Sequence, residues 1–175
     1  MRRLMLLRHA KSDWPAGMPD LDRPLAQRGM EAAPRMGCYM AEEGLLPDLA
    51  LVSPARRTDQ TWDLVAPALG MVEVRVENRI YEASPERLLE VIREVGDGVR
   101  GLLLVGHNPG TQDLAAHLVG HGDRYAFARM SQKYPTAGLA VIDFPAETWA
   151  EVDFRGGRLD RFVTPKVIGA GEDEL

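Results

Sequence analysis

The sequence predicts an α/β fold, a three-layer αβα sandwich around a mostly parallel central sheet. Two observations lead there. Short apolar runs alternate along the chain with segments whose apolar residues recur at helical spacing. Strands that are separated by helices imply parallel pairing with helices on both faces of the sheet. The 175 residues contain no internal repeat and no convincing linker, so we expect one domain.

The first half of the chain carries three apolar runs of strand length and two helical segments. The expected elements are strands at 4–7, 48–53 and 72–76 and helices at 25–43 and 54–70. The run at 4–7 is apolar throughout, which is typical of a strand buried on both faces. Pro54 stands near the start of the second helix and Gly70 follows its end, which is the usual placement of these residues.

The second half predicts a clear amphipathic helix at 85–95, in which Leu88, Leu89, Ile92 and Val95 recur at helical spacing. The remaining expected elements are a buried strand at 101–106, a helix at about 109–118, and two strands at 137–144 and 149–154 joined by a Pro-Ala-Glu-Thr turn. The last pair suggests an antiparallel edge. We assign residues 1–165 to the domain and 166–175, which end in GAGEDEL, to an acidic tail.

Composition narrows the functional classes. The net charge of −5 argues against a general nucleic-acid-binding protein, which needs a basic face. No apolar run approaches the roughly 20 residues of a membrane span, and the four apolar residues before Arg8 are too few for a signal peptide. Cys38 is the single cysteine, so no disulfide framework exists. We therefore expect a cytoplasmic protein without membrane contact.

Basic and imidazole side chains gather at the expected carboxyl ends of three strands. The first strand ends in Arg8-His9, the second is followed by Ser53 to Arg57, and the third by His107-Asn108. Ligands of such sheets bind outside these ends, where helix N-termini also point. Arg and His are costly at a buried strand end unless an anion meets them. The sequence therefore predicts a pocket for a dianion such as a phosphoryl group.

Other phosphate-handling designs are absent from the sequence. It has neither a GxxxxGK[ST] loop, nor a GxGxxG motif, nor a GxSxG nucleophile elbow. Cys38 falls within an expected helix, where we expect a buried, inert thiol rather than the reactive thiolate of a cysteine phosphatase. Histidine remains as the nucleophile.

Three stretches together resemble one known family. LLRHAKSDW resembles the Arg-His-Gly/Ala signature of the histidine phosphatase superfamily, SPARRTDQT at 53–61 resembles its phosphate-binding arginine motif, and VGHNPG at 105–110 resembles its second-histidine motif. DRPLAQRG at 22–29 and YEAS at 81–84 point to SixA-type phosphohistidine phosphatases within it. The resemblance covers residues 3–145. Thr58, where the family usually has Ala, is a small departure.

The resemblance implies a phosphoglycerate mutase-like fold, a phosphohistidine enzyme intermediate and no metal or cofactor. His9 would be the nucleophile, with Arg8, Arg57 and His107 around the phosphoryl group. Attack requires a neutral imidazole, and repulsion from these cationic neighbours would lower the pKa of His9. The motif register favours Arg57 over Arg56 as the arginine that faces the pocket.

Several residues keep more than one interpretation. Glu82 is the candidate general acid, with Asp13 and Asp22 as further possibilities, although Asp22 could instead pair with Arg23 or Arg28. Asn108 either contacts substrate or caps the following helix. Ser12 and Lys11 either touch phosphate or are solvated. His117 and His121 have the spacing of a metal pair, but favourable charge at a helix end is the better interpretation.

The leading functional hypothesis is removal of phosphate from phosphohistidine on a protein, for example a histidine phosphotransfer domain. The alternatives are a phosphatase of a small phosphomonoester, a mutase, or a non-catalytic phosphoprotein-binding module on the same fold. A mutase is disfavoured because 175 residues leave little room for cap and lid insertions. The intact His9 argues against the binding module.

Overall fold

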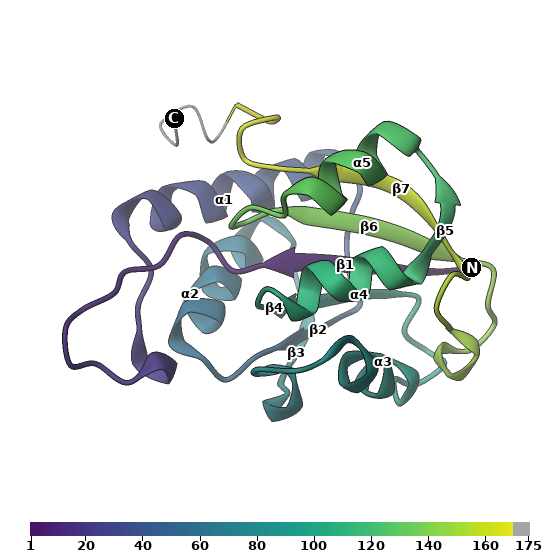
Figure 1. Ribbon diagram of the computed structural model, residues 1–175, viewed down its shortest axis with the longest axis horizontal. Helices are drawn as coiled ribbons and strands as arrows, with labels where there is room; N and C mark the ends of the chain where they lie inside the picture. Colours follow the sequence, from purple (N-terminus) through teal and green to yellow (C-terminus); the bar gives the residue numbers. More distant parts are fainter. Residues whose placement is uncertain (170–175) are drawn as a thin grey trace.

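The computed structural model describes residues 1–169. Within this range seven strands form one sheet in the order β3-β2-β4-β1-β6-β7-β5 (Figure 1). The strands are β1 (Arg2–Arg8), β2 (Leu49–Val52), β3 (Glu73–Val76), β4 (Gly101–Gly106), β5 (Val119–Gly122), β6 (Leu139–Phe144) and β7 (Gly157–Val163). β1, β2, β3 and β4 pair in parallel, as do β5 and β7, so the mostly parallel sheet is confirmed.

Five helices cover the two faces of the sheet in the described range. They are α1 (Gln27–Glu42), α2 (Arg56–Val65), α3 (Pro85–Arg93), α4 (Gly110–Leu118) and α5 (Arg124–Gln132). Met5 and Leu7 pack into the core under α1 and α2, whereas Leu4 and Leu6 pack into the core under α3, α4 and α5. The side chains of a strand alternate between its two faces, so one apolar strand builds both cores. The three-layer sandwich is confirmed (Figure 1).

β1 lies at the centre of the sheet, between β4 and β6. The four apolar side chains of residues 4–7 are completely buried. Each such burial stabilises the fold by roughly 1.5–3 kcal/mol, which makes β1 a rigid support. Its register pairs Arg8 with Gly106, and the His9 amide donates to the Gly106 carbonyl at 3.0 Å. The residues that follow β1 and β4 are therefore held beside each other.

The predictions for the C-terminal strands are partly wrong. β6 is antiparallel to both β1 and β7, so the antiparallel strand lies inside the sheet rather than at its edge. Residues 149–154 are not a strand. Trp149–Glu151 form a 3-10 turn because the Trp149 indole is buried and donates to the Val99 carbonyl at 2.6 Å. The last strand, β7, begins only after Arg155, which has a positive φ of 68°.

Two elements are missing from the sequence predictions. β5 contains two glycines and little apolar surface, so it has no strand pattern. α5 does carry a local signal, because Asp123 caps its first turn by accepting hydrogen bonds from the amides of Tyr125 and Ala126. Of the expected tail at 166–175, residues 170–175 lie outside the described range.

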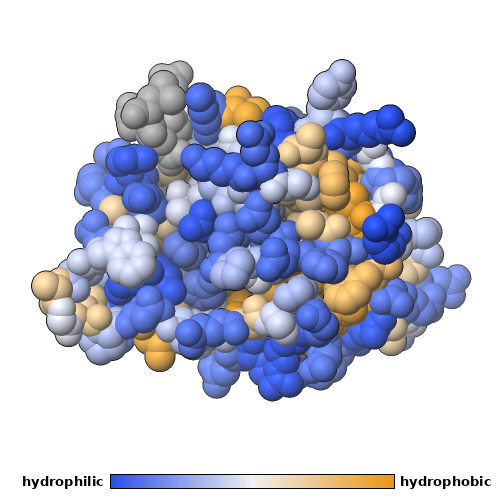
Figure 2. Space-filling view, viewed as in Figure 1, coloured by the Kyte–Doolittle hydropathy of each residue, from blue (hydrophilic) through white to orange (hydrophobic). Residues whose placement is uncertain are grey.

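The surface of the face seen in Figure 2 is mostly hydrophilic, and its apolar side chains show chiefly over the region of α4 and α5. Among residues 1–169, no helix combines the length and apolar character needed to cross a membrane.

Candidate active site

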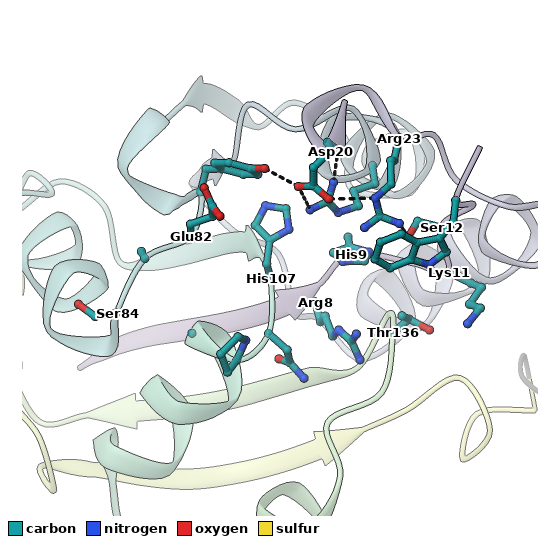
Figure 3. A pocket seen from close by; sticks show the side chains of 17 residues that line it. Arg8, His9, Lys11, Ser12, Asp20, Arg23, Glu82, Ser84, His107 and Thr136 are labelled. Atoms are coloured by element: carbon teal, nitrogen blue, oxygen red, sulfur yellow. Dashed lines mark hydrogen bonds and ion pairs between the residues drawn. The ribbon is translucent and has the colours of Figure 1, made fainter. Parts of the chain in front are cut away.

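A cavity of about 740 Å³ opens at the carboxyl ends of β1 and β4 (Figure 3). Its walls come from the loop after β1, the start of α2, residues 81–84 and the turn before α4. All seven residues that the sequence predicts for the site line it: Arg8, His9, Ser12, Arg57, Glu82, His107 and Asn108. The strand ends therefore meet as expected.

His9 is buried at the centre of this group, and its tautomer follows from its hydrogen bond. Nδ1 lies 2.8 Å from the carbonyl oxygen of Ala10. Because a carbonyl only accepts, Nδ1 carries the proton and donates it, which leaves the lone pair on Nε2. The His107 ring stands beside it, with 5.4 Å between the ring centroids. His9 is thus held with a nucleophilic nitrogen available.

Both histidines are kept neutral chiefly by burial. The pKa of His9 is lowered to about 3, chiefly by burial and also by the neighbouring His107, Arg8 and Arg57, against the raising effect of the Ala10 carbonyl. The pKa of His107 falls to about 4 through burial and then through Arg57. The sequence predicts the direction for His9 from charge repulsion, but desolvation is the larger cause.

Arg8, Arg57 and His107 line this cavity, and each has one buried nitrogen without a hydrogen-bond partner in the described structure: Arg8 Nε, Arg57 Nε and His107 Nδ1. Other nitrogens of Arg8 and His107 are held by contacts within the protein. Arg8 Nη1 donates to the Tyr134 carbonyl at 2.9 Å, and His107 Nε2 lies 2.7 Å from the Ser53 hydroxyl. A buried donor without an acceptor costs about 1–3 kcal/mol. Two guanidinium groups and a second imidazole around His9 indicate a site suited to an oxyanion.

Asp20 is the site residue that the sequence predictions miss. Arg57 Nη2 donates to its carboxylate at 3.0 Å, Arg23 Nε at 3.0 Å, and the Tyr81 hydroxyl also donates to it (Figure 3). These bonds, the one from Tyr81 first, hold the pKa of Asp20 well below its usual range. Arg23 therefore pairs with Asp20, so the expected pairing with Asp22 is wrong for this arginine. The Asp20 carboxylate lies beside the guanidinium groups of Arg23 and Arg57. The contact with Arg57 joins residues that are distant in the sequence, so the sequence alone does not reveal it.

The candidates for the general acid differ in whether they line the cavity. Glu82 lines the cavity, with an exposed side chain and a positive φ of 55°. Asp13 and Asp22 are not among the described residues that line it. Asp20 lines it but is tied to its three donors.

Ser12 and Asn108 both have partners within the protein. The Ser12 hydroxyl accepts from Arg23 Nη1 at 3.1 Å, and Asn108 Nδ2 donates to the Tyr134 carbonyl at 3.0 Å. Pro109 stands at the N-cap position of α4, so the interpretation of Asn108 as the helix cap is wrong. Lys11 is exposed at the cavity.

The two arginines at the start of α2 differ as the motif register predicts, because Arg57 is buried at the cavity and Arg56 is exposed outside it. Thr58 is completely buried and donates to the carbonyls of Ser53 and Ala55 at 2.8 and 2.7 Å. Its hydroxyl thus braces the turn before α2 and does not enter the cavity.

Cys38 and the histidine pair lie away from this site. Cys38 is exposed on α1, so the expectation of a buried thiol is wrong, but it does not line the catalytic cavity. His117 lies in the last turn of α4 and donates to the Asp113 carbonyl at 2.6 Å, whereas His121 belongs to β5. Residues 1–169 contain no group of three or more His, Cys, Asp or Glu side chains that could hold a metal ion.

Comparison with known proteins agrees with this geometry. The family model of the histidine phosphatase superfamily (branch 1) matches residues 4–88. An uncharacterized protein of Mycobacterium tuberculosis is 39% identical over 165 residues, covering 91% of this chain and 100% of the relative. An uncharacterized chloroplastic protein of Arabidopsis thaliana is 29% identical and covers 94% of this chain and 78% of the relative.

Solved structures extend the likeness to the whole fold. A structure assigned as phosphohistidine phosphatase SixA from Agrobacterium tumefaciens is 31% identical, with a TM-score of 0.80 over 94% of this chain and 98% of that chain. A mycobacterial glucosyl-3-phosphoglycerate phosphatase shares the fold at 18% identity and a TM-score of 0.63, covering 92% and 98%. These likenesses support phosphatase activity and confirm the phosphoglycerate mutase-like fold. The chain is a SixA-type member of the histidine phosphatase superfamily.

Proposed function

We propose that this protein hydrolyses phosphohistidine on a protein substrate through a phosphoenzyme on His9. The observation that carries the proposal is the set of two guanidinium groups and a second imidazole around a neutral, oriented imidazole in one cavity. Arg8, Arg57 and His107 bind the phosphoryl oxygens in this scheme. Ser12 and Asn108 complete the wall of the site.

The reaction proceeds in two displacements. His9 Nε2 attacks phosphorus, the P–N bond to the substrate imidazole breaks, and its electron pair returns to the departing nitrogen. Water then attacks the phosphohistidine, giving inorganic phosphate and neutral His9, and loses its proton to solvent. Negative charge on the three equatorial oxygens is met by the guanidinium groups of Arg8 and Arg57 and by the His107 imidazole, which already line the cavity. Since guanidinium groups supply this neutralisation, we propose that the reaction needs no metal.

Asp20 cannot supply the proton that the leaving group of a phosphate ester needs. An alkoxide leaving group needs a proton, but a phosphohistidine already protonated at its other ring nitrogen leaves as neutral imidazole. Among the described lining residues the carboxylates are Asp20 and Glu82. Asp20 stays ionised because its pKa is held so low, and therefore cannot donate a proton at neutral pH. The 31% identity to the Agrobacterium tumefaciens structure named as a phosphohistidine phosphatase supports the same substrate class.

The test measures phosphate release from a phosphohistidine peptide and from common phosphomonoesters, with the wild type and with His9→Ala. We expect faster turnover of the peptide, loss of at least about a thousandfold in the variant, and an alkali-stable phosphoryl group on His9 by mass spectrometry. Activity should be unchanged by EDTA. Full activity of His9→Ala, or turnover of neither substrate, would show that the proposal is wrong.

A phosphatase of a small phosphomonoester is the second candidate, and the presence of Glu82 at the cavity is the observation that favours it. In that case monoesters would be the better substrates, and Glu82→Gln would abolish their hydrolysis.

A further inference from the structure

We infer that a basic groove beside the catalytic cavity binds an acidic segment of the phosphorylated protein substrate. The inference rests on the proposed function and adds the kind of partner that the enzyme selects. The basic groove is formed by Arg129, Lys133, Phe162, Lys166 and Val167, between the end of α5 and the segment after β7.

The groove combines basic and apolar side chains in a space of about 740 Å³. Lys133 and Lys166 are exposed, and Val167 is 60% exposed. The Arg129 guanidinium lies over the Phe162 ring and donates to the Phe162 carbonyl at 3.1 Å, which fixes its position. None of the described residues that line the groove is acidic.

This composition contrasts with that of the whole chain, which has 26 acidic and 21 basic residues. The chain has three lysines: two of them, Lys133 and Lys166, line the groove, and the third, Lys11, lines the catalytic cavity. A local basic surface on an acidic protein attracts acidic partners and orients their approach. The charge therefore selects a partner whose surface is acidic near the phosphorylated histidine.

A short wall separates the groove from the catalytic cavity. Pro135 lines the groove and the next residue, Thr136, lines the cavity, where Figure 3 shows it near Arg8. The Tyr134 carbonyl accepts from both Arg8 and Asn108, so the wall is tied to the phosphoryl-binding residues. A protein whose phosphoryl group reaches His9 extends across this wall, whereas a free phosphohistidine ends inside the cavity.

The experiment compares two substrates, free phosphohistidine and a phosphorylated histidine phosphotransfer domain with an acidic surface. The test variant is Lys133→Glu/Lys166→Glu. The control is Arg100→Glu/Arg124→Glu, which makes the same change in net charge at exposed positions before β4 and at the start of α5, away from the catalytic cavity.

We expect the test variant to raise KM for the phosphorylated domain about tenfold or more, with its rate on free phosphohistidine within about twofold of the wild type. The control should resemble the wild type on both substrates. The defect should shrink in about 0.5 M salt, because exposed charges are screened there. An equal loss on both substrates, or no loss on the domain, would overturn the inference.

Two further experiments distinguish a failure of the proposed function from a failure of the groove inference. If the wild type hydrolyses neither substrate, the proposed function fails, and the groove is judged by fluorescence anisotropy with a labelled hexaglutamate peptide. Weaker binding by the test variant than by the control supports the groove, and equal binding refutes it. If truncation after Gly169 and the charge reversal both accelerate turnover of the phosphorylated domain, the groove serves the chain's own acidic end and the inference is wrong.

Discussion

Acidification should destabilise this protein through the two histidines of its active site. His9 and His107 have pKa values of about 3 and about 4 in the folded protein, against a usual value of 6.5. The unfolded chain therefore binds more protons than the folded protein between these values and 6.5. The stability due to each histidine is fully present above pH 6.5 and is lost as the pH falls toward the folded pKa.

The size of the effect follows from the shifts. At pH 5 both folded histidines are still largely neutral, while their unfolded counterparts are almost fully protonated. One pKa unit corresponds to about 1.4 kcal/mol, so lowering the pH from 8 to 5 costs about 2 kcal/mol per histidine and about 4 kcal/mol for the pair. Asp20, whose pKa is lowered, loses its contribution only at still lower pH.

Urea denaturation at several pH values between 5 and 8 measures this dependence. His9→Asn keeps an amide that can donate to the Ala10 carbonyl, and His107→Gln keeps one that can reach Ser53. Each variant should be less pH-sensitive than the wild type by about one proton, or about 1.4 kcal/mol per pH unit near pH 5–6. Both substitutions remove the titrating group and retain a polar partner.

The reasoning would be refuted if the wild type and the two variants lost stability in parallel on acidification. It would equally fail if an NMR titration of the wild type showed His9 becoming protonated near pH 6.5. Either result would mean that burial does not hold the nucleophile neutral.

Three further predictions concern single residues. Asp20→Asn should lower kcat on phosphohistidine about tenfold, because the carboxylate that fixes Arg57 loses its charge; an unchanged kcat would dismiss this positioning role. Glu82→Gln should leave phosphohistidine turnover within about twofold, since no leaving-group acid is required, and a large loss would contradict that mechanism. Gly29→Ala places a Cβ 2.1 Å from a backbone oxygen of the loop after β1 and should cost about 1–3 kcal/mol in unfolding free energy, whereas Gly98→Ala, with open space around it, is the control.

Local patterns sufficed for much of the fold. The apolar run at 4–7, the helical spacing at 85–95 and the Pro/Gly placement around α2 each correspond to elements of the structure. The predictions failed where distant contacts decide. Residues 149–154 are predicted as a strand, but Trp149–Glu151 form a 3-10 helix in which the buried Trp149 contacts Val99.

At the site, too, some residues follow from local sequence and others from contacts between distant parts of the chain. His9, Arg8, Arg57 and His107 could be predicted from sequence because they lie at or shortly after the carboxyl ends of buried strands, and parallel strands bring these ends to one edge. Asp20 could not, since it begins a 3-10 turn after β1 and its partners Arg57 and Tyr81 come from two other parts of the chain.

The sequence by itself predicted the class of fold, the residue that we propose as nucleophile and the residues that we propose to bind the anion, because these predictions depend on strand ends and short motifs. Only the tertiary structure decided how His9 is kept neutral, since burial is a property of everything packed around it. It alone also placed two of the three lysines in one groove, next to the catalytic cavity, because Lys133 and Lys166 lie on segments that meet only when the chain folds.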